Sequence, residues 1–104
     1  MDLPAQTPEP PYYAVIFTSI RHDGDNGYTE TAKEMIDLAS SQSGFLGFES
    51  ARQEIGISVS YWSSLEAIAA WKGNLAHRHA QGCAKQWYKT FRVRVCRVER
   101  EYGF

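Results

Sequence analysis

Residues Ile55 to Trp87 have the sequence IGISVSYWSSLEAIAAWKGNLAHRHAQGCAKQW. The rest of the chain is organised around this stretch. Its first part, Ile55 to Tyr61, alternates large apolar residues with small ones, which predicts a strand. The alternation leaves open which face of that strand meets a layer of helices. The stretch contains all three tryptophans and two of the three histidines of the chain. We therefore expect a functional site to draw most of its residues from here.

The segment after this strand predicts a helix. Ser63 is followed three residues later by Glu66, which is the spacing of a capping box. Gly73 and Asn74 predict the end of that helix, because both residue types weaken a helix interior. A second helical segment then carries the two histidines and ends near Trp87.

Three strands and one helix complete the pattern. β-Branched and aromatic residues predict strands over Tyr12–Arg21, Phe45–Gln53 and Thr90–Tyr102. An apolar stripe with helical spacing predicts a helix from Tyr28 to Ala39. Gly44 follows it as the expected left-handed cap.

Several residues interrupt the strand patterns. Gly47 and Gly56 predict bulges, or places where another group approaches the backbone closely. In the last strand Val98 breaks the alternation of the preceding valines, which predicts a bulge near Cys96 and Arg97. This strand is also longer than usual, so we expect its outer half to pair outside its own sheet.

The order of these elements is β-α-β-β-α-β, which predicts an α+β fold of the ferredoxin-like type. In this arrangement an antiparallel sheet carries helices on one face only. The first and third strands nevertheless show apolar residues on both faces. We expect a second copy of the chain to cover the other face, which makes the protein a homodimer.

Length and charge bound the remaining possibilities. The chain has 104 residues and a net charge of -1, which indicates one domain and argues against nucleic acid as a partner. The proline-rich residues 1–11 predict a disordered tail before a domain over 12–104. The sequence shows neither a membrane span nor an export signal. We therefore expect a cytoplasmic protein without a membrane partner, in which Cys83 and Cys96 are reduced.

A set of residues spread over most of the chain resembles the antibiotic biosynthesis monooxygenase superfamily. The resemblance extends from Tyr12 to Tyr102 and implies a dimeric α+β barrel. Known members include cofactor-independent oxygenases that act on polycyclic phenols, haem-degrading enzymes, and proteins without an assigned activity. The residues that carry the resemblance are Tyr61-Trp62-x-Ser64-x-Glu66-Ala67, Trp71, His77, Ala80-Gln81, Arg92-Val93-Arg94-Val95 and Val98-x-Arg100.

Haem is the cofactor that one branch of this superfamily would imply. That branch uses an asparagine on the first strand, a tryptophan on the helix after the third strand, and a histidine ten residues later. Trp71 matches the tryptophan, but Gln81 stands at the histidine position and Tyr12–Arg21 contains no asparagine. Haem is therefore possible but disfavoured, and no other cofactor or metal is expected.

The cofactor-free members imply a different site. Their deprotonated substrate supplies electrons to dioxygen, so the protein needs a base, a dry pocket and hydrogen-bond donors. His77 is the candidate base and the Trp71 N–H the candidate donor. The residues expected to line the pocket are Trp62, Ser58, Ser60, Phe17, Gln81 and His79. The alternative is that the histidines are structural or exposed and the tryptophans belong to the core.

The sequence is compatible with three functions. The first is a cofactor-independent monooxygenase that acts on a small aromatic or polycyclic substrate. The second is a non-catalytic dimer that binds a small apolar molecule. The third is a haem-binding or haem-degrading protein.

Overall fold

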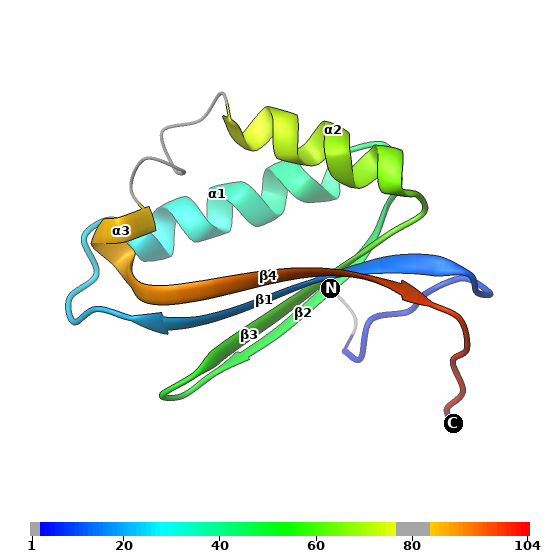
Figure 1. Cartoon of the computed structure of the whole chain (residues 1–104), viewed down its shortest axis with the longest axis horizontal. Coiled ribbons are helices and arrows are strands. Elements are labelled where there is room, and N and C mark those ends of the chain that lie inside the picture. Colours follow the sequence, from blue (N-terminus) through cyan, green and yellow to red (C-terminus); the bar gives the residue numbers. More distant parts are fainter. Residues whose placement is uncertain (1–2, 77–83) are drawn as a thin grey trace.

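The computed structural model describes residues 3–76 and 84–104. Its four strands form one antiparallel sheet in the order β2-β3-β1-β4. Helices α1 and α2 lie over one face of the sheet, and the C-terminal end of the chain lies toward the other face (Figure 1). The predicted α+β, ferredoxin-like fold is confirmed. The elements are β1 (Tyr12–Arg21), α1 (Tyr28–Ser40), β2 (Phe45–Arg52), β3 (Gly56–Trp62), α2 (Leu65–Ala76), α3 (Ala84–Trp87) and β4 (Tyr88–Val98).

The strand register defines two sides of the sheet. On β3, Trp62 stacks on Trp71 of α2, so the side that carries Trp62 is the helix-facing side. Side chains alternate along a strand, so Gly56, Ser58 and Ser60 lie on this side as well. The apolar residues between them, such as Val59, lie on the open side. The sequence did not decide which face of β3 meets the helices, and the structure shows that it is the face with Gly56, Ser58 and Ser60.

The N-terminus of α2 differs from the predicted capping box. The backbone N–H of Ala67 donates to Ser64 Oγ over 3.1 Å, so Ser64 is the cap. Ser63 instead donates its backbone N–H to the carbonyl of Gly44 over 2.8 Å. The capping box between Ser63 and Glu66 is therefore wrong, because Ser63 holds the chain against the start of β2.

The prediction that α2 ends at Gly73 is also wrong. The helix continues through Gly73 and Asn74 to Ala76. The Asn74 side-chain amide donates to Gln42 Oε1 over 2.8 Å and to the carbonyl of Ala70 over 3.3 Å. These bonds tie α2 to the residues after α1 and offset the low helix propensity of the two residues.

The last strand is more regular than predicted. β4 pairs with β1 without interruption from Val98 to Thr90, and the register shifts only between Ile20 and Arg21 of β1. The bulge predicted near Cys96 and Arg97 is therefore wrong. Val98 lies on the open side opposite Tyr12, because ordinary alternation places it there. The strand also ends at Val98, four residues before the predicted end at Tyr102.

Two glycine predictions are confirmed. Gly44 has φ +88°, the left-handed conformation expected after the helix. The register of β2 against β3 shifts between Phe45 and Gly47, which is the bulge expected there.

The N-terminal residues 3–11 contain no helix or strand, and they contact the open side of the sheet. The backbone N–H of Ala5 donates to the Glu49 carboxylate over 3.1 Å. The Thr7 hydroxyl lies 3.0 Å from that of Tyr12 and donates to the Glu101 carboxylate over 2.6 Å. None of the helices that the structure describes has the length and apolar character needed to cross a membrane.

Candidate functional site

The candidate site is built on a strip of small residues on the helix-facing side of the sheet. β3 contributes Gly56, Ser58 and Ser60 to this strip, and Ser50 of β2 lies beside Ser58. Both β3 serines are half-buried, so the helices above do not seal them from solvent. Small side chains leave volume that a ligand can occupy. We call these four residues the serine strip.

One end of the serine strip is closed by aromatic rings. Trp62 is fully buried, and its ring lies 6.1 Å from that of Trp71 with the planes inclined by 25°. Phe45 meets Trp62 edge-on with the centroids 5.5 Å apart. Trp62 Nε1 donates to Ser60 Oγ over 2.9 Å, so that indole N–H is already used. The structure thus brings together three residues that the sequence predicted, Trp62, Ser60 and Trp71.

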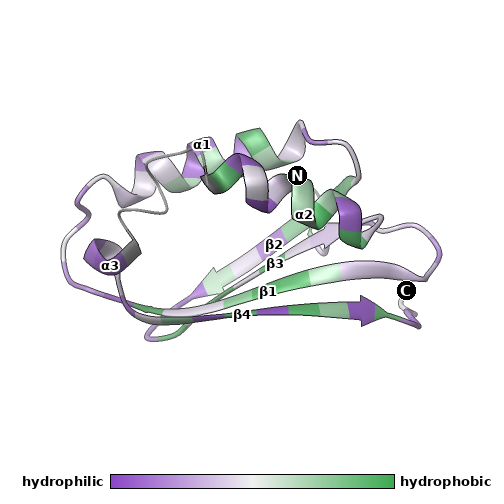
Figure 2. Ribbon diagram, turned by 45° about the horizontal axis from the view of Figure 1, so that its top comes forward, coloured by the Kyte–Doolittle hydropathy of each residue, from purple (hydrophilic) through white to green (hydrophobic). Residues whose placement is uncertain are grey.

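The helices leave the β4 half of this side uncovered. Phe91, Val93 and Val95 lie on the helix-facing side, yet they are 47%, 48% and 51% exposed. In Figure 2 the middle of β1 is green, and β4 alternates between green and purple beneath the helix layer. Access to the serine strip is therefore open along this edge.

A second aromatic group flanks the strip on its β1 side, where Phe17 lies opposite Ser58. The Phe17 ring stacks on that of Phe91 with centroids 5.5 Å apart, and it meets Tyr88 edge-on at 5.3 Å. Tyr28, the first residue of α1, contacts the rings of Trp87 and Tyr88 at 5.7 Å each. Phe17 therefore lies between the strip and a tyrosine pair that the sequence did not indicate.

The tyrosine pair is half-buried, and the Arg21 guanidinium packs against the Tyr28 ring. Burial raises the pKa of the Tyr88 hydroxyl, and its hydrogen bond with Tyr28 raises that pKa further. The positive charges of Arg52 and Arg21 act in the opposite direction on this pKa. One sequence signal could have located Arg52: it faces Gly56 across a short hairpin.

The other predicted site residues cannot be placed. His77, His79 and Gln81 lie outside the described residues, so their roles stay predictions. Among residues 3–76 and 84–104, no group of three or more His, Cys, Asp or Glu side chains could hold a metal ion.

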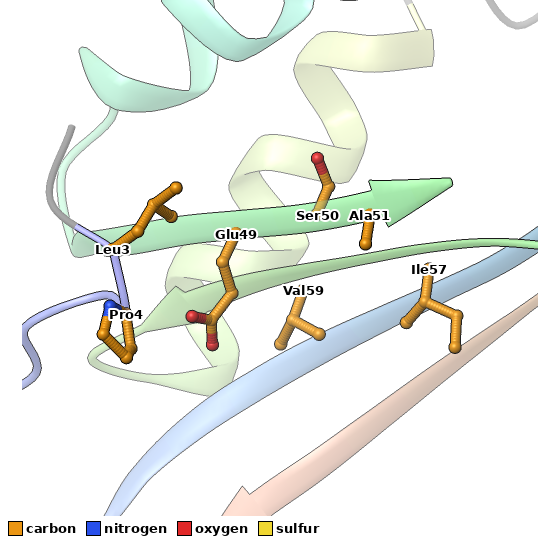
Figure 3. Close-up of a pocket in the computed structure, with 7 residues that line it drawn as sticks. All are labelled: Leu3, Pro4, Glu49, Ser50, Ala51, Ile57 and Val59. Carbon is orange, nitrogen blue, oxygen red and sulfur yellow. The ribbon is translucent and has the colours of Figure 1, made fainter. Parts of the chain in front are cut away.

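A separate, shallow pocket of about 600 Å³ lies on the open side (Figure 3). In this view Val59 and Ile57 point away from the helices, whereas Ser50 points toward them. Glu49 at its rim accepts hydrogen bonds from the Tyr61 hydroxyl and the Ala5 N–H. The pocket therefore differs from the serine strip in being apolar and in lying on the opposite face. Its lining residues are Leu3, Pro4, Glu49, Ser50, Ala51, Ile57 and Val59.

Comparison with known proteins gives one family. The family model "Antibiotic biosynthesis monooxygenase" matches residues 11–82. The chain is 48% identical over 107 residues to YqjZ, an uncharacterized protein of Bacillus subtilis (strain 168), and the match spans all of this chain and 94% of that protein.

Solved structures share the fold at low sequence identity. A mutant of SnoaB, a cofactor-independent oxygenase from Streptomyces nogalater, has a TM-score of 0.75 at 8% identity, covering 86% of this chain and 95% of that one. PA3566 from Pseudomonas aeruginosa has a TM-score of 0.69 at 9% identity, covering 91% of this chain and 99% of that one.

Proposed function

The chain belongs to the antibiotic biosynthesis monooxygenase family, and on this premise we propose that it is a cofactor-independent monooxygenase of a flat aromatic substrate. The observation that carries the proposal is the Trp62–Trp71 stack at the end of the half-buried serine strip. A flat ring could lie on the strip, with the Trp71 indole at its edge. The same fold in SnoaB, a cofactor-independent oxygenase, supports the proposal.

The reaction needs an acidic C–H or O–H on the substrate and dioxygen as the oxidant. Removal of the proton leaves a carbanion or phenolate that passes electrons to dioxygen, and a C–O bond forms. The O–O bond then breaks, so that one oxygen atom stays in the product and the other leaves as water. A ring CH₂ thereby becomes a carbonyl, and O₂ accepts all four electrons.

The residues of the site divide these tasks. Trp71 supplies an indole N–H for which the described part of the chain contains no hydrogen-bond partner, so it can donate to the developing oxyanion. Phe17 and Trp62 bound the strip with apolar rings against which a flat substrate can pack. His77 is our candidate base, and the support for it is the sequence pattern alone. His79 and Gln81 stay further candidates on the same basis.

We propose that no cofactor takes part. β1 spans Tyr12–Arg21 as predicted and has no asparagine, and Gln81 stands ten residues after Trp71 where the haem-degrading pattern has histidine. Haem added to the protein should therefore give no saturable shift of its Soret absorbance band.

We also propose that two copies associate through the open side. Ile57 on that side is 42% exposed, and it lies in an apolar pocket beside Val59. A surface of this kind is stabilised when a second sheet covers it. Light scattering at micromolar concentration should give the mass of a dimer, and the mass of a monomer would exclude this association.

The test of the function is dioxygen consumption by chelator-treated protein. We expect protein-dependent oxygen uptake with anthrone or 1-naphthol after subtraction of the background oxidation. The quinone product should carry one ¹⁸O atom when ¹⁸O₂ is used. Saturable binding of these probes without oxygen uptake would contradict the proposal and support the non-catalytic binding protein instead.

A further inference from the structure

A guanidinium group is held in a fixed place at the Gly56 end of the serine strip. Arg52 lies directly over Gly56: a Cβ atom built on Gly56 would come within 2.1 Å of Arg52 Cζ. The Arg52 guanidinium donates to Ser19 Oγ and, over 3.5 Å, to the Ser19 carbonyl. Ser19 itself is 1% exposed. Gly56 therefore provides the room that Arg52 needs, and buried Ser19 fixes its orientation.

A second guanidinium group comes from Arg21, two residues after Ser19 on β1. Arg21 Cζ lies 3.6 Å from the centroid of the Tyr28 ring, which is a cation–π contact. Its Nη2 donates to the carbonyls of Gly24 and Asp25 over 3.1 and 3.4 Å. Its Nε is buried and has no partner within residues 3–76 and 84–104.

The two positive charges have only neutral hydrogen-bond partners in the described chain. Arg52 is bound by a hydroxyl and a carbonyl, and Arg21 by two carbonyls. Hydrogen bonds from Thr29 lower the pKa of the Asp25 carboxyl and the charge of Arg21 adds to this, but within the described residues neither arginine donates a hydrogen bond to this carboxylate. Arg52 is bonded to Ser19 and Arg21 lies two residues further along β1, so the two guanidinium groups repel each other, and an anion between them would remove that repulsion. Planar guanidinium groups bind planar carboxylates with two parallel hydrogen bonds, which makes a carboxylate the best-matched anion.

We infer that Arg21 and Arg52 bind the carboxylate of an aromatic acid whose ring lies on the serine strip. The inference rests on the proposed function in placing the ring there. Ser58 lies two residues from Gly56 along β3, a distance of about 7 Å, so a one- or two-ring acid can reach both places. Tyr28, whose ring packs on Arg21, and Tyr88, whose ring meets that of Tyr28, complete this end of the site.

The test is calorimetric titration of the full chain under nitrogen, with 2-naphthoate as the probe. We expect saturable binding at one probe per chain. The neutral isostere 2-naphthamide should bind at least about tenfold more weakly because it cannot make charge-assisted bonds. Acetate, which has the charge without the ring, should also bind at least about tenfold more weakly.

Five variants test where the probe binds. Arg52→Gln and Arg21→Gln should each weaken 2-naphthoate about tenfold or more. Gly56→Ala should do the same while every charge is retained, because its new methyl group displaces Arg52. Arg100→Gln removes the same charge in the segment after β4, at the other end of that strand from Tyr88, and should leave the affinity unchanged. Thermal melting of each variant checks that it folds, and Arg52→Lys, which keeps the charge, should bind more tightly than Arg52→Gln.

Equal binding of 2-naphthoate and 2-naphthamide would overturn the inference, and so would unchanged affinity in a folded Arg52→Gln variant. Acetate or phosphate that binds as tightly as 2-naphthoate would show an anion site without an aromatic ligand, which also overturns it. The proposed function fails separately. Arginine-dependent binding of 2-naphthoate without oxygen uptake from any aromatic acid would leave this site standing and remove the oxygenase. Oxygen uptake from an aromatic acid that is the same in Arg52→Gln as in the unaltered chain would keep the oxygenase and remove this site.

Discussion

The indole rings of Trp62 and Trp71 stack 6.1 Å apart, with their planes inclined by 25°. The contact joins β3 to α2, and its two members differ in exposure. Trp62 is fully buried and donates its N–H to Ser60, whereas Trp71 is half-buried. The Trp62 ring therefore stabilises the fold, whereas the Trp71 ring is accessible to a ligand.

This difference predicts separate effects of truncating the two rings. Trp62→Ala should lower the free energy of unfolding by about 3–5 kcal/mol, the usual cost of deleting a buried large aromatic side chain. Trp71→Ala should cost less, because part of its ring already contacts water. Urea unfolding followed by circular dichroism measures both. A larger loss for Trp71→Ala would show that the outer ring is the structural one.

A second prediction concerns the glycine that follows α1. Gly44→Ala should destabilise the protein more than Gly27→Ala, although both glycines have φ near +80°. At Gly27 the new methyl group meets nothing within 4 Å, so only the strained backbone costs free energy, about 1–2 kcal/mol. At Gly44 it would lie 2.6 Å from Ala67 Cβ, which adds about 1–3 kcal/mol of overpacking. Equal losses in urea unfolding would mean that α2 moves away at no cost.

A third prediction concerns alkaline pH. Burial raises the pKa of the Tyr61 hydroxyl above the ordinary 10.0, and its hydrogen bond to Glu49 adds to this. Burial and a hydrogen bond to Glu101 likewise raise the pKa of Tyr12. Below pH 10 the folded and unfolded chains both keep these protons, so the full stability is present. Above pH 10 the unfolded chain loses them first, so the free energy of unfolding should fall as pH rises.

Urea unfolding between pH 8 and pH 11.5 measures this fall. Tyr61→Phe removes one of the titrating groups, so its free energy of unfolding should decline less steeply above pH 10 than that of the unaltered chain. Tyr102→Phe is the matched control, because Tyr102 is 93% exposed and its loss should leave the slope unchanged. A slope that is the same in all three proteins would show that Tyr61 does not contribute.

Much of the fold follows from local patterns in the sequence. β1 spans Tyr12–Arg21, the range that its β-branched and aromatic residues predicted. Apolar residues on both faces of a strand are typical of a strand with neighbours on both sides of the sheet. α2 was predicted less well. The sequence cannot show that Ser63 binds the Gly44 carbonyl or that Asn74 binds Gln42, because these partners are distant along the chain.

The candidate site was predictable in part for the same reason. Trp62 and Trp71 lie in one strand–helix unit, so their proximity follows from short-range geometry. Tyr28 and Tyr88 come together only through the pairing of β1 with β4 and the packing of α1, which no local pattern indicates. Arg52 and Gly56 are an intermediate case. They face each other across the β2–β3 hairpin, so a glycine opposite an arginine was a readable signal.

The proposed function requires that the substrate is oxidised on the helix-facing side of the sheet and not in the open-side pocket. The most direct test compares kcat/KM for oxygen uptake in two variants that each add a leucine. Ser58→Leu fills the serine strip, and Ala51→Leu fills the pocket on the other face. We predict that Ser58→Leu loses at least about 99% of kcat/KM, because a ring can no longer lie on the strip, while Ala51→Leu stays within about twofold of the unaltered chain. Suppose that both variants fold, that Ser58→Leu keeps full activity and that Ala51→Leu loses it. This result would show that the reaction takes place in the open-side pocket and not on the serine strip.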